Sequence, residues 1–332
     1  MKPISTCTVE ADTAIVPVPG MHIEAAEWSG NAELLEIRLP GPLDLESTLE
    51  CGQAFRWNRV KGPDGRTWFR GVVDSIGVMV TTDDASRLLV LYEPNGTDRD
   101  SLARRIFSYF SLDDDLDAIH RFLLEEACPE SRHRQHEVIK QAVRHARGLR
   151  ILRQEPWECL VSYIISANKN IPAICKTVDY LAQSLGSPAG LGQYTFPTPQ
   201  ALLEAGADCV KQSKCGYRAP YILDAAGKVL DKQVDLLTVQ HLPTDQARHE
   251  LLKIMGVGPK VADCALLFGY HRLEVFPVDV WIARCMSVFF TDGKALTPKE
   301  ARQEGSRRFG PYAGYAQQIL FHYSRNVLRG RL

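Results

Sequence analysis

The sequence has no apolar stretch close to the roughly 20 residues that a membrane-spanning helix needs. Its first twenty residues also lack the continuous apolar segment of a secretory signal, so an intracellular protein is expected. A repeat and a low-complexity tract are absent as well. These absences favour a folded intracellular protein over a membrane or secreted one.

Metal-binding patterns are missing too. Nine cysteines are present, but none forms a C-x-x-C pair, which excludes a zinc ribbon and a tight four-cysteine iron–sulfur loop. Their irregular spacing favours reduced thiols over a disulfide framework. Three histidines, His133, His136 and His145, have no carboxylate or cysteine at ligand spacing and are expected at the surface. No metal site is therefore predicted.

The net charge of the whole chain is only −1, but its two halves carry opposite net charges. Residues 1–140 contain 15 Lys and Arg against 24 Asp and Glu, which gives −9. Residues 141–332 contain 24 against 16, which gives +8. The basic C-terminal half permits a surface for nucleic acid without requiring one.

The apolar pattern divides the chain into a β-rich part and a helical part, an α+β fold. Alternating runs bounded by turn residues predict antiparallel strands at 34–40, 54–60, 67–73, 76–82 and 87–93. Helical spacing follows at 99–110 and 113–127, and from about 134 almost to the end, with breaks at 185–199, 214–221 and 291–299. The predicted organisation is a flexible tail (1–20), an antiparallel β-rich domain (21–135) and a helical domain (136–332).

A glycine-rich turn, "MGVGPKVA", lies inside the helical part. It is neither a dinucleotide-binding fingerprint, because Val261 replaces the third glycine, nor a P-loop. An amphipathic segment ending at Gly256 precedes it, so the unit is helix, hairpin, helix. Gly256, Val257 and Gly258 can present backbone N–H groups and a helix N-terminus to one phosphate. An ordinary turn with a glycine C-cap explains the hairpin equally well.

Lys260 and Asp279 favour the functional interpretation. A lysine acts as a nucleophile only when its amine is uncharged, and a helix N-terminus in a partly desolvated site favours that form. Asp279 precedes the apolar run "VWIARC" and is expected to be an N-cap. The same carboxylate could stabilise a developing cation. N-capping alone is the commoner fate of such an aspartate.

Six separated motifs, in order, resemble the helix-hairpin-helix (HhH-GPD) DNA glycosylases, in particular their 8-oxoguanine DNA glycosylase/AP lyase branch. They are "CGQAFRW" (51–57), "LRQEPWECLVSYIISANKNI" (152–171), "GYRAPY" (216–221), "GVGPKVADCALL" (256–267), "FPVDVW" (276–281) and "GPYAGYAQQILF" (310–321). The resemblance implies that the sheet of the N-terminal domain is of the TATA-binding-protein type and that the helical domain is catalytic.

The resemblance also implies a reaction. Family members flip a damaged base out of duplex DNA and cut its glycosidic bond. By motif, Lys260 would attack the sugar C1′ and form a Schiff base that leads to β-elimination. Asp279 would support the oxocarbenium-like transition state. No cofactor is expected, although a structural monovalent or divalent cation at the hairpin is conceivable.

Four residues would then bind the extruded base. The backbone carbonyl of Gly52 would accept the N7 proton that distinguishes 8-oxoguanine from guanine. The base would be sandwiched between Phe321 on one face and Cys264 on the other. Gln317 would read its Watson–Crick edge. Taken singly, Phe321 and Cys264 are more typical of core packing, and Gly52 of a strand or bulge.

Three further residues would meet the DNA that the base leaves behind. Asn168 would fill the stack or touch the orphaned cytosine, Tyr217 would be a wedge and Arg218 would read cytosine. A solvated helix start explains the Tyr-Arg pair without DNA. The chain departs from many relatives at three positions: Ala173 replaces an arginine that faces the cytosine, Lys169 an asparagine, and Trp281 a histidine. Looser opposite-base discrimination is therefore expected.

Two other functions fit part of the pattern. Alkylated-base glycosylases keep the aspartate without the lysine, and a non-catalytic DNA-binding hairpin needs neither Lys260 nor "GQAFRW". Adenine- and pyrimidine-excising relatives usually carry a C-terminal four-cysteine cluster, but no cysteine follows Cys285. The expected partner is double-stranded DNA containing 8-oxoguanine, bound by a monomer with no membrane association. Its location would be cytoplasmic and nucleoid-associated in a bacterium, or nuclear in a eukaryote.

Overall fold

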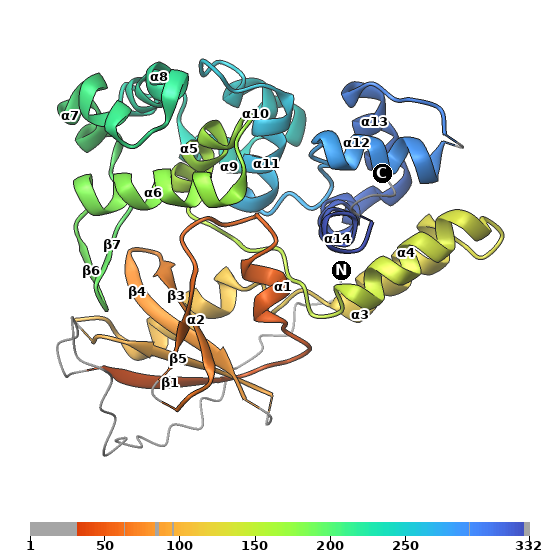
Figure 1. The fold of residues 1–332 in the computed structure, drawn as a ribbon, viewed down its shortest axis with the longest axis horizontal. Coiled ribbons are helices and arrows are strands. Elements are labelled where there is room, and N and C mark those ends of the chain that lie inside the picture. The colour runs from red at the N-terminus through yellow and green to blue at the C-terminus, as the bar shows by residue number, and fades with distance from the viewer. Residues whose placement is uncertain (1–31, 63, 84–85, 95, 292, 329–332) are drawn as a thin grey trace.

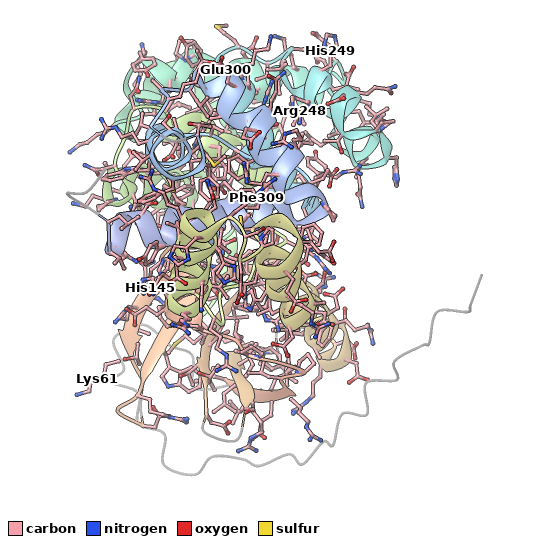
Figure 2. All side chains as sticks on the ribbon, turned by 90° about the vertical axis from the view of Figure 1, so that its right-hand side faces the viewer. Lys61, His145, Arg248, His249, Glu300 and Phe309 are labelled. Atoms are coloured by element: carbon pink, nitrogen blue, oxygen red, sulfur yellow. The ribbon has the colours of Figure 1, made fainter. Side chains whose placement is uncertain are left out.

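The computed structural model describes residues 32–62, 64–83, 86–94, 96–291 and 293–328. The predicted tail (1–20) lies outside them. An antiparallel sheet occupies one end of the molecule and helices occupy the rest (Figure 1). Figure 2, turned by 90°, shows Lys61 at the sheet end and Arg248 at the opposite, helical end. None of the described helices is long and apolar enough to cross a bilayer.

The sheet has five strands in the order β1-β5-β4-β3-β2, and every neighbouring pair is antiparallel. The strands are β1 (Glu33–Arg38), β2 (Asn58–Lys61), β3 (Thr67–Val73), β4 (Ile76–Thr82) and β5 (Arg87–Tyr92). One face packs on α2 (Arg99–Tyr109) around a core that includes Val80, Val90 and Ile106. Four strands match the prediction closely. The second begins only at Asn58, because residues 54–57 form a loop against the helical domain.

The helical part contains the larger core. Its elements are α3 (Leu116–Phe122), η1 (Leu123–Ala127), α4 (His133–His145), α5 (Pro156–Ser166), α6 (Ile171–Leu185), α7 (Pro199–Gln212), η2 (Gly216–Arg218), α8 (Ala219–Leu230), α9 (Leu236–His241), α10 (Thr244–Leu251), α11 (Pro259–Tyr270), α12 (Val280–Cys285), η3 (Met286–Phe290), α13 (Pro298–Phe309), η4 (Gly310–Tyr312) and α14 (Ala313–Asn326). The short helix α1 (Leu45–Leu49) belongs instead to the core of the sheet.

Two further details differ from the sequence-based expectation. The segment 185–199, predicted as a plain break, contains a small hairpin of β6 (Pro188–Gly190) and β7 (Gln193–Tyr194). His136 is buried rather than at the surface, because its Nδ1 lies 2.8 Å from the carbonyl oxygen of Cys128. The α+β class is confirmed. The likeness of the sheet to the TATA-binding protein stays a prediction, and so does the boundary at 135/136, which falls within α4.

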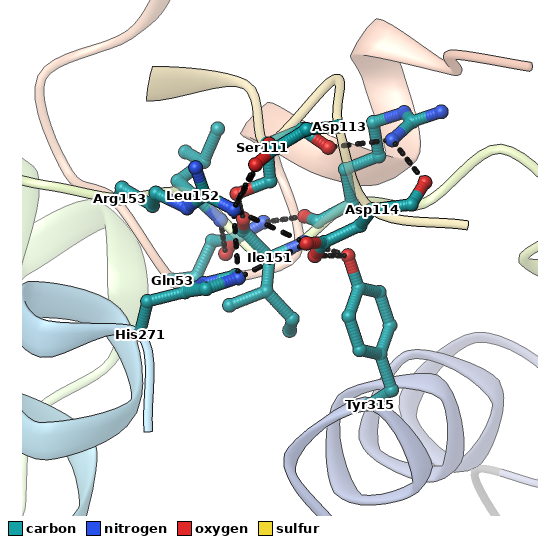
Figure 3. A network of polar contacts seen from close by, with 10 residues as sticks. Gln53, Ser111, Asp113, Asp114, Ile151, Leu152, Arg153, His271 and Tyr315 are labelled. Carbon is teal, nitrogen blue, oxygen red and sulfur yellow. Dashed lines mark hydrogen bonds and ion pairs between the residues drawn. The ribbon is translucent and has the colours of Figure 1, made fainter. Parts of the chain in front are cut away.

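A buried polar network joins the two parts of the molecule (Figure 3). Asp114, in the loop before α3, accepts hydrogen bonds from Tyr315 on α14 (2.5 Å) and from Arg153 before α5 (3.2 Å). Its carboxylate also lies 3.1 Å from Nε2 of His271, which ends α11. The start of α14, the segment before α5 and the end of α11 are thus all bound to the carboxylate of Asp114.

Gln53 is the second centre of that network. Its amide nitrogen donates to the carbonyl oxygens of Thr48 (2.7 Å) and Arg150 (2.8 Å), and its amide oxygen accepts from the N–H of Leu152 (2.9 Å). Because a buried amide with all these bonds is costly to disturb, Gln53 fixes the backbone of the neighbouring residue, Gly52.

Candidate active site

The hairpin between α10 and α11 is built as predicted, although α10 already ends at Leu251. Gly256 has φ +79°, and a Cβ there would lie 2.3 Å from Cδ2 of Tyr221, so only glycine fits. Val257 is buried, and Gly258 is the N-cap of α11 with no side-chain hydrogen bond to the helix. The first N–H groups of α11 therefore remain available to an anion.

Lys260 lies in the first turn of α11 and is partly buried. Its Nζ donates to Oγ of Ser166 over 3.3 Å and lies 4.8 Å from the centre of the Tyr163 ring. Both partners belong to the C-terminal half of α5. The amine therefore sits at the boundary between a packed aromatic cluster and the loop that follows α5, rather than deep within the apolar core.

Asp279 is the N-cap of α12, as predicted, and its Oδ1 accepts from the N–H of Ile282 over 2.9 Å. Burial raises the pKa of Asp279, while the Ile282 N–H and the charge of Lys260 act in the opposite direction. The two charges are thus close enough to influence each other. The fold brings together a lysine and a carboxylate that are 19 residues apart in the sequence.

The four residues predicted to hold the base come from three elements. Gly52 has φ +83°, and an added Cβ would lie 2.6 Å from Ile171 and 3.7 Å from Phe321. Its carbonyl oxygen accepts from the Tyr163 hydroxyl over 3.2 Å and keeps a second lone pair. Phe321 and Gln317 are one turn apart on α14. Gly52 and Phe321 are therefore neighbours, as the prediction requires.

Gln317 and Cys264 are both buried. Within the described part of the chain, the amide oxygen of Gln317 has no hydrogen-bond partner, which is unusual for a buried polar atom. Burial raises the pKa of the Cys264 thiol to about 11, although the positive charge of Lys260 opposes the shift. The Cys264 thiol is therefore protonated, and the amide oxygen of Gln317 lacks a partner within the described part of the protein. Both features suit a site that binds a polar ligand such as a base.

The three residues predicted to meet the opposite strand lie close to one another. Asn168 is exposed in the α5–α6 loop with φ +52°, and Tyr217 is 56% exposed. Arg218 is buried: it donates to the carbonyl oxygens of Ala167 and, over 3.1 Å, Cys215, and its guanidinium lies 4.3 Å from the centre of the Tyr217 ring. Contact between Arg218 and cytosine stays a prediction, because it needs this side chain to exchange its backbone partners.

Tyr217 also packs against Tyr221, with ring centres 6.0 Å apart. Tyr221 is the residue that meets Gly256 of the hairpin. The predicted wedge and the predicted phosphate grip are therefore supported by the same side chain on α8.

The three positions at which the chain departs from many relatives, 169, 173 and 281, have different surroundings. Lys169 donates to Oγ1 of Thr177 (2.6 Å) and to the carbonyl oxygen of Lys214 (2.8 Å). Burial and the charge of Arg218 lower the pKa of Lys169. Ala173 lies in the first turn of α6, where its N–H is capped by Asn170, and Trp281 is partly buried in α12.

Sequence reasoning missed Tyr163 and Ser166, which contact Lys260, and Ile171, which faces Gly52. All three lie in or beside an apolar run whose spacing is that of any core helix, so nothing marked them. Among the described residues no group of three or more His, Cys, Asp or Glu could hold a metal ion. A cation at the hairpin stays a prediction.

Comparison with known proteins places this arrangement in a class. Residues 161–311 match the model of the HhH-GPD superfamily base excision DNA repair proteins, and residues 37–160 match the model of the 8-oxoguanine DNA glycosylase N-terminal domain. The fold is thus that of a helix-hairpin-helix base excision repair protein. Within that superfamily, the chain belongs to the 8-oxoguanine DNA glycosylase family.

Individual relatives agree with the assignment. The structure of MBOgg1 in complex with a low-affinity DNA ligand is 35% identical, has a TM-score of 0.78, and the match covers 90% of this chain and 97% of that one. The Clostridium acetobutylicum 8-oxoguanine glycosylase/lyase bound to DNA with cytosine opposite 8-oxoguanine is 30% identical (TM-score 0.77; 90% and 97% covered). A probable N-glycosylase/DNA lyase of Methanothermobacter thermautotrophicus is 28% identical over 87% of this chain and 96% of its own length.

Proposed function

We propose that this protein is a bifunctional DNA glycosylase and AP lyase that removes 8-oxoguanine from double-stranded DNA in base excision repair. The observation that carries the proposal is that Lys260, at a helix N-terminus without a side-chain cap, lies close enough to the partly buried carboxylate of Asp279 for its charge to lower the pKa of that carboxyl. Family membership supplies the substrate class, because relatives bear the names N-glycosylase/DNA lyase and 8-oxoguanine glycosylase/lyase.

The first chemical step breaks the bond between the damaged base and its sugar. The extruded base stacks on Phe321, with Gln317 offering its unsatisfied amide oxygen to the Watson–Crick edge. The carbonyl oxygen of Gly52 accepts a hydrogen bond from the N7–H group. As the base departs with the bonding electrons and takes up a proton, positive charge develops on the sugar, and the carboxylate of Asp279 stabilises it.

The second step uses the amine. The lone pair of the uncharged Lys260 Nζ forms a bond to C1′, and one proton passes from the nitrogen to the ring oxygen O4′. The C1′–O4′ bond then breaks, which opens the sugar ring and leaves a protonated Schiff base. Removal of a 2′ proton then expels the 3′ phosphate by β-elimination, and water releases the lysine. Ser166 and the Tyr163 ring hold the amine in place before attack. No cofactor takes part in this scheme.

The DNA is held by groups that surround this centre. The hairpin 256–258 grips one backbone phosphate, Asn168 and Tyr217 enter the space left by the base, and Arg218 turns toward the orphaned cytosine. With Ala173 in place of an arginine, selectivity for cytosine is weaker than in relatives. The protein acts as a monomer on chromosomal DNA, in the cytoplasm of a bacterium or the nucleus of a eukaryote.

Borohydride trapping tests the chemistry. A duplex containing 8-oxoguanine should become covalently attached to the wild-type protein, and Lys260→Gln should abolish the adduct. Lys253→Gln is a matched control, because Lys253 belongs to the same hairpin region but pairs with Glu250. Equal trapping by the Lys260 variant and the wild type would show that another amine reacts.

A substrate panel tests the specificity. Excision of 8-oxoguanine opposite C, A, G and T should proceed with smaller differences than a strongly cytosine-selective relative shows. Release of 3-methyladenine in place of 8-oxoguanine would instead assign the chain to the alkylated-base glycosylases. Binding of duplex without release of any base would support a non-catalytic hairpin protein.

A further inference from the structure

Arg325 is a cation that the scheme above does not use. It lies on α14, one turn after Phe321 and two turns after Gln317, so the three side chains share one face of the helix. Its guanidinium carbon is 5.3 Å from the centre of the Phe321 ring. The arginine therefore borders the surface on which the base is expected to stack.

The same side chain also acts on the catalytic carboxylate. The positive charge of Arg325 is one of the influences that lower the pKa of Asp279 against the effect of burial. Helix α12, which Asp279 caps, also packs against α14. Arg325 therefore lies beside Phe321 and on a helix that packs against the element carrying Asp279, the two groups expected to flank the reacting nucleotide.

Arg325 has no partner of opposite charge within the parts of the chain that the structure describes. It makes neither a hydrogen bond nor an ion pair there, and its aromatic contact uses none of its five N–H donors. Nearby arginines behave differently: Arg307 and Arg308 on α13 both donate to Glu304. Trp281, two residues after Asp279, replaces a histidine of some relatives, so this position supplies no cation next to Asp279.

Resting on the proposed function, we infer that Arg325 binds a phosphate adjacent to the extruded nucleotide and thereby positions its sugar between Lys260 and Asp279. A guanidinium presents a planar pair of donors that matches phosphate oxygens. The phosphates of the extruded nucleotide are joined to the sugar whose C1′ reacts. A cation that reaches the Asp279 region is consequently within range of that backbone. Arg325 is a substrate-positioning residue rather than a chemical participant.

The salt dependence of DNA binding measures this contact without catalysis. The ligand is a duplex with a tetrahydrofuran abasic analogue, which carries no base to excise and no aldehyde to form a Schiff base. Arg325→Met keeps an unbranched chain against Phe321 but removes the charge. It should reduce the slope of log K against log salt by about 0.9, the value for one lost phosphate contact. Arg325→Lys should retain most of the slope.

Arg134→Met is the matched control. The guanidinium of Arg134, on α4, lies 5.5 Å from the centre of the Phe289 ring, a similar cation–π geometry. Phe289 follows Asp279 by ten residues, about 15 Å along a helix. This control should leave the slope at the wild-type value. Thermal unfolding of each variant checks folding, and Arg325→Gln replaces the methionine variant if that protein does not fold.

Three outcomes would overturn the inference. An unchanged slope in Arg325→Met would leave only the contact with Phe321. An equal loss of slope in Arg134→Met would show a non-specific charge effect. A shift of the acid limb of the pH–rate profile with no change in slope would show that Arg325 acts through Asp279 instead. If the wild type excised a different base, the proposed substrate would be wrong, but a reduced slope would still establish the phosphate contact.

Discussion

The amine of Lys260 lies over the ring of Tyr163, with Nζ 4.8 Å from the ring centre. The hydroxyl of the same tyrosine donates to the carbonyl oxygens of Gly52 (3.2 Å) and Gln53 (3.3 Å). One buried side chain therefore contacts the proposed nucleophile, Lys260, with the face of its ring and the loop of Gly52 with its hydroxyl. Its ring stacks on Phe268 of α11, with ring centres 5.5 Å apart, which fixes its orientation.

Tyr163→Phe should separate these two roles. The ring remains under Lys260, but the Gly52 carbonyl loses its donor, at a cost of about 1 kcal/mol in positioning. We expect excision of 8-oxoguanine to lose about fivefold in selectivity over guanine in single-turnover assays. Trapping on a duplex with a pre-formed abasic site should be unchanged, because that step needs only the amine. A loss of trapping equal to the loss of excision would place the hydroxyl in the lysine chemistry.

The pH dependence of base excision should report Asp279. Burial raises the pKa of this carboxyl above its ordinary value of 3.8. Because the reaction needs the ionised form, activity is lost as the pH falls through the raised pKa, at a higher pH than for an exposed aspartate. Single-turnover excision measured from pH 4 to 8 should show this acid limb. Asp279→Asn, which cannot ionise, should reduce excision by at least about 100-fold and remove the limb.

Asp114→Asn should destabilise the fold in a pH-dependent way. Burial alone would raise the pKa of Asp114, but the hydrogen bond and charge of His271, with Tyr315 and Arg153, hold it below the ordinary value. The ionised carboxylate therefore adds stability above about pH 4, and this contribution disappears as the pH falls through the lowered pKa. We expect a loss of about 3 kcal/mol at pH 7.

Denaturant unfolding of wild type and variant at pH 7 and pH 3 checks this expectation. Asp113→Asn provides the comparison, because the Asp113 side chain is 52% exposed and also pairs with Arg153. That variant should change the stability little. A difference between Asp114→Asn and wild type that persists undiminished at pH 3 would show that packing, and not the charge, accounts for the loss.

Much of the fold was predictable because its signals are local. The alternation in "IGVMVTT" and the aspartate before "VWIARC" follow from side-chain geometry within a few residues, and β4 and the α12 N-cap appear where expected. The pattern "AFRWNRV" alternates in the same way and predicts a strand at 54–57, where the structure has a loop. Its conformation is set instead by distant partners, such as the pair between Arg56 and Glu158.

The sequence predicts the proposed reacting residues of the site but not the residues that position them. Lys260 and Asp279 stand out because each is an unusual choice for its local position. Tyr163, Asp114 and Arg325 do not, since a tyrosine in an apolar helix, an aspartate in a loop and an arginine near a helix end are ordinary locally. Their roles depend on tertiary neighbours: Asp114 bonds Tyr315 and Tyr163 bonds Gly52, each more than 100 positions away. The role of Arg325 depends on where α14 places it relative to Asp279.

The contact of Gly256 with Tyr221, and of Tyr221 with Tyr217, has a mechanical consequence. If the hairpin binds a DNA phosphate as proposed, Tyr221 would connect that contact to the exposed ring of Tyr217. Phosphate binding and insertion of the Tyr217 ring into the base stack would then be coupled through α8.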